Sequence, residues 1–255
     1  MDAGPGDRAG RVTVTFAGCG DAFGHGGRFQ ACIHLGSAGS GQVLLDCGAT
    51  SLTALRRCGI EPRGIAAVCI SHLHGDHFGG LPFLILDGQF SGRTKPLAII
   101  GPAGTRVRLH TAMECMFPGS ADAARNFDVV VTELRPGVPE LADGVTVTAT
   151  EAAHPSGAPA LALRLDIGGK IIAYTGDAAW TESLVRVAMG ADLLIAEAYH
   201  RDKAVPHHLR LTDIDAHRAE LNCREIVLTH MSADVLGHPD LARYQAAHDG
   251  LVLQI

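Results

Sequence analysis

The feature that most constrains this chain is a segment with four potential metal ligands in six residues, His72-Leu73-His74-Gly75-Asp76-His77. It follows an uninterrupted apolar run, residues 65–70, which predicts a buried strand. Loops after strand ends are where rigid scaffolds hold functional side chains. Imidazole and carboxylate ligands suit zinc, iron or manganese rather than calcium. The segment therefore predicts a metal site at a strand end, because a solvated polar loop rarely gathers so many ligands.

Three further ligands follow other predicted strands. His154 comes after a strand that ends near residue 153, Asp177 follows residues 170–175, and His230 follows residues 225–229. Taken alone, each has a plain structural explanation, such as a turn aspartate or a packed histidine. Because all three lie at the carboxyl ends of apolar strands, we expect them to meet residues 72–77 at one edge of the sheets.

Short β-rich runs separated by turn signals recur along the 255 residues, with helical stretches between them. Predicted strands cover residues 12–17, 42–46, 65–71, 97–100, 129–134, 145–150, 160–167, 170–175, 193–196, 225–229 and 251–254. Predicted helices cover residues 51–57, 105–117, 181–189 and 212–221, the last with Thr212 as its N-cap. Gly168-Gly169 predicts a hairpin turn. This order predicts an α+β protein with two packed sheets and helices outside them.

Composition limits the class of protein further. Hydrophobic residues make up 47% of the chain, enough for a substantial core, so we expect one domain over residues 11–255 after a flexible tail of residues 1–10. The net charge is −6 and no basic block occurs, which argues against a nucleic-acid or membrane surface. The seven cysteines form no Cys-x-x-Cys pair, and the first eleven residues have no apolar core. We therefore expect a cytoplasmic protein.

The segment Ser-His-Leu-His-Gly-Asp-His-Phe-Gly-Gly-Leu-Pro, residues 71–82, resembles the signature of the metallo-β-lactamase superfamily. Within it, the chain is similar to the ribonuclease Z and small phosphodiesterase branch. Residues 18–24, 44–48, 175–177 and 228–231 support the match, which extends from about residue 12 to the end. The resemblance implies a four-layer αββα sandwich, with two mixed sheets between layers of helices.

The resemblance also implies two divalent metal ions, zinc first and manganese or iron as alternatives. The implied ligands are His72, His74 and His154 for one ion and Asp76, His77 and His230 for the other, with Asp177 as the bridge. Two ions about 4 Å apart can hold a bridging hydroxide and clamp a substrate oxygen. Asp76 is then also a catalytic candidate, because it can orient that hydroxide.

Glu197 and His208 are candidates for protonating the leaving group. In the ribonuclease Z branch, a glutamate and a histidine at similar places act as a pair. A glutamate that holds an imidazole raises its pKa and favours its acid form. The sequence Ala196-Glu197-Ala198 matches only the Glu and Ala of that branch's His-Glu-Ala-Thr motif. A surface histidine in a mobile loop is the alternative for His208.

The glycine-rich loop of residues 18–28 follows the first strand and is expected to line the pocket. Its Phe23, His25 and Arg28 are candidates for substrate binding. For Phe23, packing within the loop is an equal alternative.

The number of residues between two of the implied ligands indicates the size of the substrate. Ribonuclease Z enzymes carry a long tRNA-gripping arm between the third-motif histidine and the bridging aspartate. Only 22 residues separate His154 from Asp177 here, and they predict two strands and a hairpin. With the acidic balance, this predicts a phosphodiesterase for a small cyclic or short phosphodiester and argues against a nucleic-acid partner.

Three alternatives stay open at this point. They are a hydrolase of a lactone, β-lactam or thioester, a ribonuclease Z-like enzyme of tRNA 3′ processing, and a non-catalytic metal-binding sensor. A sensor would be expected to lack a ligand, and all seven ligand positions are filled. The resemblance also suggests a homodimer, because dimers are common in the family. No segment of the sequence indicates where an interface would lie.

Overall fold

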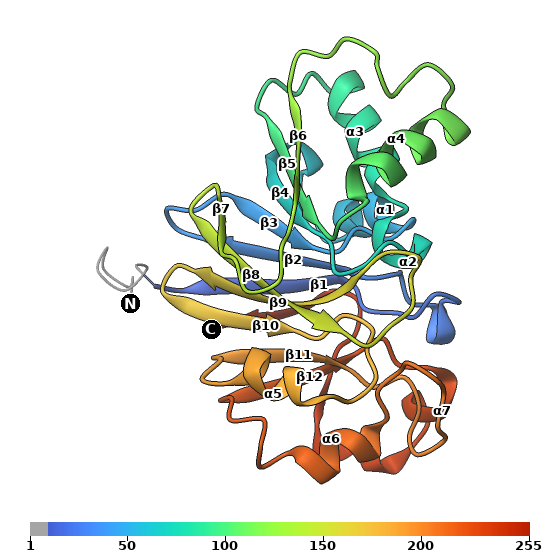
Figure 1. The fold of residues 1–255 in the computed structure, drawn as a ribbon, viewed down its shortest axis with the longest axis vertical. Coiled ribbons are helices and arrows are strands. Elements are labelled where there is room, and N and C mark those ends of the chain that lie inside the picture. The colour runs from blue at the N-terminus through green and yellow to red at the C-terminus, as the bar shows by residue number, and fades with distance from the viewer. Residues whose placement is uncertain (1–9) are drawn as a thin grey trace.

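The computed structural model describes residues 10–255, so most of the tail expected over residues 1–10 lies outside the described residues. Two seven-stranded sheets pack face to face, and helices cover the outer face of each (Figure 1). This arrangement confirms the αββα sandwich and the α+β class.

The first sheet has the strand order β14-β1-β2-β3-β4-β5-β6. Its strands are β1 Val12–Gly18, β2 Cys32–Ser37, β3 Gln42–Leu45, β4 Ile65–Cys69, β5 Leu97–Gly101, β6 Val129–Glu133 and β14 Leu251–Gln254. β3 to β6 run parallel, whereas β14, β1, β2 and β3 pair antiparallel. The carboxyl ends of β3 to β6 therefore face one edge of the molecule.

The second sheet has the strand order β13-β12-β11-β10-β9-β8-β7. Its strands are β7 Glu140–Ala142, β8 Val145–Ala152, β9 Ala160–Ile167, β10 Lys170–Tyr174, β11 Leu193–Glu197, β12 Glu225–Thr229 and β13 Gln245–Ala246. β10 to β13 are parallel, and β7 to β10 are antiparallel. Gly168 and Gly169 both have positive φ angles, +57° and +76°, which confirms the predicted hairpin turn between β9 and β10.

Helices form the two outer layers (Figure 1). Those over the first sheet are α1 Ser51–Arg57, α3 Leu81–Phe90 and α4 Thr105–Met116, and those over the second are α5 Glu182–Ala188, α6 Leu211–His217 and α7 Ala233–Leu236. The remaining turns are α2 Gly75–Phe78, η1 His25–Gly27, η2 Pro62–Gly64 and η3 Pro239–Arg243. None of the helices among residues 10–255 is long and apolar enough to cross a membrane.

Three apolar layers hold the sandwich together. The central layer lies between the sheets and includes Phe16, Leu45, Leu163 and Ile195, all essentially inaccessible to solvent. Burying one such side chain contributes roughly 1.5–3 kcal/mol. Because both sheets share this core, we infer that residues 11–255 form a single domain. The loops at the strand ends thus sit on a rigid base.

Two sequence expectations need correction. The helix expected from residue 212 begins at Leu211, with Arg210 rather than Thr212 at its N-cap. The reason is the carboxylate of Asp213, which accepts a hydrogen bond of 2.9 Å from the backbone N–H of Arg210. The second correction is the helix α3, which the sequence analysis did not predict. Apolar residues surround most of its circumference, so its sequence lacks the one-sided apolar pattern that indicates a surface helix.

Candidate active site

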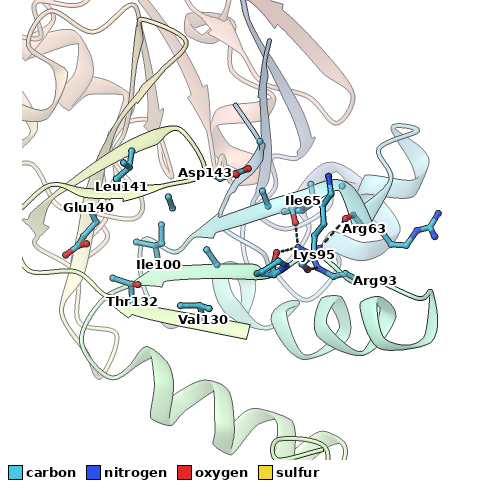
Figure 2. A pocket seen from close by; sticks show the side chains of 16 residues that line it. Arg63, Ile65, Arg93, Lys95, Ile100, Val130, Thr132, Glu140, Leu141 and Asp143 are labelled. Atoms are coloured by element: carbon cyan, nitrogen blue, oxygen red, sulfur yellow. Dashed lines mark hydrogen bonds between the residues drawn. The ribbon is translucent and has the colours of Figure 1, made fainter. Parts of the chain in front are cut away.

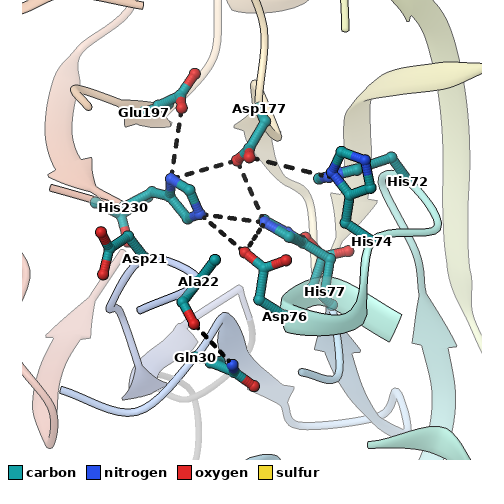
Figure 3. A network of polar contacts seen from close by, with 12 residues as sticks. Asp21, Ala22, Gln30, His72, His74, Asp76, His77, Asp177, Glu197 and His230 are labelled. Carbon is teal, nitrogen blue, oxygen red and sulfur yellow. Dashed lines mark hydrogen bonds and ion pairs between the residues drawn. The ribbon is translucent and has the colours of Figure 1, made fainter. Parts of the chain in front are cut away.

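All seven predicted ligands lie at the carboxyl ends of strands and converge on one small volume. Figure 3 shows six of them, His72, His74, Asp76, His77, Asp177 and His230. His72 and His74 follow β4, and α2 then carries two more ligands. Three ligands follow the ends of β8, β10 and β12, namely His154, Asp177 and His230. The ligand atoms fall into two adjacent groups, each with all its members within 4.8 Å of one another.

The first group, which we call the first trio, contains His72, His74 and His154. Nδ1 of His74 lies 3.1 Å from Nε2 of His72 and 3.1 Å from Nε2 of His154. Burial and neighbouring histidines lower the pKa of both His72 and His74, which keeps these rings neutral. Three imidazoles whose ring nitrogens converge this closely can offer lone pairs to one cation, the usual donor set of zinc.

The second group, which we call the second trio, contains Asp76, His77 and His230. Oδ2 of Asp76 lies 3.2 Å from Nε2 of each histidine, and the two Nε2 atoms are 3.3 Å apart. The backbone of His230 has a φ of +54°, which is uncommon for a residue other than glycine.

Asp177 lies between the two trios. Its Oδ1 is 3.3 Å from Nε2 of His77, and its Oδ2 is 3.9 Å from Nε2 of His72 and 4.0 Å from Nε2 of His154. One carboxylate oxygen therefore faces each group, as a bridging ligand requires.

Two buried atoms at this centre have no hydrogen-bond partner among the described residues, Oδ1 of Asp177 and Nδ1 of His230. Burial would raise the pKa of Asp177, but the positive charges of His230 and His77 hold it well below its usual range. An ionised carboxylate oxygen that is buried without a hydrogen bond is costly unless cations balance its charge. The residues of both trios and Asp177 therefore fit a pair of divalent ions.

Asp46 supports the second trio, a role that the sequence analysis missed. Its Oδ2 accepts hydrogen bonds from Nδ1 of His77 at 2.7 Å and from the hydroxyl of Tyr174 at 2.8 Å. The backbone N–H and the hydroxyl of Ser71 also donate to this carboxylate, at 2.7 and 2.8 Å. A carboxylate that binds Nδ1–H orients the ring and leaves Nε2 free for a metal. The available signal was an aspartate directly after the strand of residues 42–45.

Glu197 and His208 lie together beside the centre. Nδ1 of His208 is 2.5 Å from Oε1 of Glu197 and 3.9 Å from Oδ2 of Asp177. The other Glu197 oxygen accepts from the backbone N–H groups of Ala178 and Leu209, at 3.0 and 3.1 Å. Burial would lower the pKa of His208, but the hydrogen bond and charge of Glu197 outweigh it and raise the pKa. The structure thus pairs these residues, and the acid role stays a prediction.

The three substrate-binding candidates differ in their surroundings. Phe23 is 78% exposed, and its ring lies edge-on to the ring of His25 in the same loop, with centroids 6.3 Å apart. The ring of His25 is held by the buried Asp21 through Nδ1, at 2.5 Å. Arg28 donates to the carbonyl of Ala247 at 2.7 Å, so part of its guanidinium is already engaged. Substrate binding by these residues stays a prediction.

A large groove among the described residues lies elsewhere. It has a volume of about 600 Å³ and runs between β4, β5, β6 and the β7 region, with Lys95, Val130 and Leu141 in its lining (Figure 2). None of the seven ligands lines it. Convergent ligands, and not cavity size, therefore locate the active site.

A sequence model described as Anti-Pycsar protein Apyc1 matches residues 12–244, most of the chain. The chain belongs to the Anti-Pycsar protein Apyc1 family. Among curated relatives, a ribonuclease Z of Methanothermobacter thermautotrophicus is 28% identical over 272 residues, with 87% of each chain covered. A ribonuclease Z of Bacillus licheniformis is 27% identical over 249 residues and covers 76% of this chain and 79% of its own.

Solved structures agree with these relatives. The metallo-β-lactamase fold protein YhfI of Bacillus subtilis superimposes with a TM-score of 0.79 at 23% identity, covering 96% of this chain and 99% of its own. The short form of human tRNase Z superimposes with a TM-score of 0.77 at 25% identity, covering 94% and 98%. A diphosphatase of the PhnP family has a TM-score of 0.74 at 21% identity, covering 96% and 97%.

The comparisons confirm the predicted metallo-β-lactamase superfamily and its ribonuclease Z-like branch. This chain is a metal-dependent hydrolase of the phosphodiesterase-like kind. The expectation that nucleic acid is not a partner finds no support, because the curated relatives are named ribonuclease Z. The number and identity of the metal ions, the cytoplasmic location and the homodimer stay predictions.

Proposed function

We propose that the protein is a dinuclear phosphodiesterase for a small cyclic or short phosphodiester, with zinc as its metal. The observation that carries the proposal is the Glu197–His208 pair, with Nδ1 of His208 only 3.9 Å from the bridging Asp177. This pair adds a proton donor to a site that otherwise needs only metal ligands. Hydrolysis of a carbonyl substrate depends less on a glutamate–histidine pair of this kind.

We assign a role in the reaction to each group from its position in the site. When bound, a pair of zinc ions lowers the pKa of water and neutralises charge on a phosphate. Asp76, which lies beside both histidines of the second trio, orients the attacking water. His208 donates its proton to the leaving oxygen as the P–O bond breaks. Glu197 holds His208 through Nδ1, so that Nε2 is the nitrogen free to donate.

Substrate size is supported by the connection between the two central ligands. The residues between His154 and Asp177 form β9, the Gly168-Gly169 turn and β10. All of this stretch except its short links belongs to the second sheet, so it cannot reach out to grip a folded RNA.

The acid role of His208 is tested with two phosphodiesters that differ in their leaving groups. In the H208A variant, turnover of an alkyl phosphodiester should fall roughly 10²–10⁴-fold, because an alkoxide must be protonated as it leaves. Turnover of bis(p-nitrophenyl) phosphate should fall much less, because p-nitrophenolate leaves without a proton. Equal turnover of the alkyl substrate by wild type and variant would remove His208 from this role.

Ribonuclease Z-like processing of tRNA 3′ ends is the second candidate, and the named relatives favour it. Zinc-loaded protein should be assayed on a small cyclic phosphodiester, bis(p-nitrophenyl) phosphate, a precursor tRNA and a lactone. The proposal expects turnover of the first two substrates. Cleavage of precursor tRNA alone would replace the proposal with the second candidate, and turnover of the lactone alone would favour a carbonyl hydrolase.

A further inference from the structure

The segment between β11 and α6, residues 198–210, packs against the metal site at its carboxyl end. Two backbone hydrogen bonds close its base, from Tyr199 N–H to the Leu209 carbonyl at 2.9 Å and from Leu211 N–H to the His200 carbonyl at 2.8 Å. Its middle, which includes Lys203, is exposed to solvent. The segment is thus anchored at both ends and free at its tip.

One peptide near the end of this segment contacts the first trio directly. The carbonyl of His207 lies 2.9 Å from Nδ1 of His154 and can accept its N–H. The next residue is His208, whose ring lies 4.9 Å from the ring of His154 in an edge-to-face arrangement. A support for a metal ligand and the proposed general acid are therefore neighbours in the chain.

The backbone of His207 is held in an unfavourable conformation. Its φ is +66°, in the left-handed region that non-glycine residues rarely adopt. Its side chain is exposed, so side-chain packing does not explain this conformation. Strain of this kind persists where other contacts determine the local structure. The conformation closes a turn, in which the backbone N–H of His208 donates to the carbonyl of Val205 at 3.2 Å, and the same turn places the His207 carbonyl against His154.

The tautomer of His154 links that contact to the metal. A neutral imidazole carries one N–H, on either Nδ1 or Nε2. A metal ion at Nε2 leaves the proton on Nδ1, where it must be donated to a partner. Without a metal, the proton can move to Nε2, and Nδ1 then repels the His207 carbonyl. Metal at the first trio therefore strengthens the attachment of the segment.

The geometry points to His207 as a positioning residue, whose backbone carbonyl couples metal binding at the first trio to closure of the segment that carries His208. By thermodynamic reciprocity, the closed segment raises metal affinity at the first trio by the same factor. This coupling rests on the proposed metal site, and it means that metal binding precedes the positioning of His208. The general acid is in place only when the first trio holds its ion.

Trypsin cleavage after Lys203 measures closure without any assay of activity. The bond between Lys203 and Ala204 lies in the exposed part of the segment, and mass spectrometry identifies its cleavage. In the wild type, saturating zinc should slow this cut about tenfold relative to protein treated with a chelator. The H74A variant should lose this protection and D76A should keep it, because His74 belongs to the first trio and Asp76 to the second.

Two matched variants at His207 test the effect of its backbone conformation apart from that of its side chain. Asparagine tolerates a positive φ, whereas a β-branched residue strongly disfavours it. H207N should keep both the zinc protection and the wild-type zinc affinity. H207V should lose the protection and bind one of its two zinc ions about tenfold more weakly. Circular dichroism of the metal-free variants checks that both are folded.

The outcomes separate the inference from the proposed function. Zinc binding to the wild type without slower cleavage after Lys203 would overturn the inference alone. Wild-type protection and affinity in H207V would do the same, as would equal loss of protection in H74A and D76A. Failure of the wild type to bind zinc would overturn the proposed function together with the inference.

Discussion

Unfavourable backbone conformations gather around the metal ligands. Of the non-glycine residues with positive φ in the described part of the chain, Asp46, His207 and His230 all contact the site. The ligands themselves were predictable, because a histidine or aspartate after an apolar strand is visible in the sequence. The supports were not, because the role of Asp46 depends on side-chain direction and that of His207 on a backbone carbonyl.

Replacing Asp46 with asparagine tests the support of the second trio. D46N keeps the size of the side chain but removes the charge that holds Nδ1–H of His77. We expect one of the two zinc ions to bind about 10–100-fold more weakly, while the first trio, which Asp46 reaches only through the Ser71 hydroxyl beside His72, is affected less. Competition with a chromophoric chelator measures both affinities.

Y174F is the matched control for D46N, because it removes only one of the donors to Asp46. It should change zinc affinity much less and should cost about 1 kcal/mol of stability, the net value of one hydrogen bond. Unchanged affinity at both sites in D46N would show that Asp46 does not support the metal.

Zinc affinity should depend on pH in a defined direction. Burial would lower the pKa of His77 and of His230, but the charge of Asp177 outweighs burial and raises both. In the metal-free protein these rings therefore hold protons at neutral pH, and a metal ion must displace them. As pH rises towards the raised pKa of His230, about 10, fewer protons compete, so zinc affinity should increase from neutral pH up to that value.

Calorimetry in two buffers of different ionisation enthalpy measures the protons released by zinc. Release should be largest near neutral pH and should decline as pH approaches 10. Affinity that does not change with pH, with no proton release, would contradict the assignment of these histidines as ligands.

At the scale of elements, clear periodicity and turn chemistry were predictable. The bounds of β9, β12 and α1 agree with the sequence analysis residue for residue, and the Gly168-Gly169 turn follows from its dipeptide. The missed elements lack such signals. β7 and β13 have only three and two residues, and they exist because they pair with β8 and β12. Only the tertiary fold supplies that pairing.

Gly176 lies between two segments that carry ligands. It directly precedes Asp177 in the chain, and it packs against Ser71, which directly precedes His72. Its φ is +57°, and an added Cβ would lie 2.8 Å from Cβ of Ser71 and 3.2 Å from the carbonyl of Leu161. Gly169 has a φ of +76° and open space around it. Both G176A and G169A should lose about 1–2 kcal/mol from backbone strain. G176A should lose roughly 1–3 kcal/mol more, because of overpacking.

Urea unfolding measures the two stabilities, and zinc titration gives the functional consequence. Since Gly176 separates β10 from Asp177 and Ser71 precedes His72, only G176A should also weaken zinc binding. Equal losses of stability in the two variants would show that the close approach at Gly176 is relieved without cost.

At the scale of the whole molecule, the sandwich brings ligands from both halves of the chain to one edge. The first sheet supplies the ligands after β4, and the second supplies those after β8, β10 and β12. This convergence could be predicted from placement after strands together with the family resemblance. The separation of the site from the groove lined by Lys95, Val130 and Leu141 could not, because that groove forms only where residues from distant parts of the chain meet.

The central claim is that seven side chains hold two adjacent metal ions that share Asp177. Anomalous diffraction from zinc-loaded crystals, collected on both sides of the zinc absorption edge, tests it most directly. We predict two peaks, one among His72, His74 and His154 and the other among Asp76, His77 and His230, each in contact with Asp177. A single peak, or two peaks of which only one touches Asp177, would contradict the account.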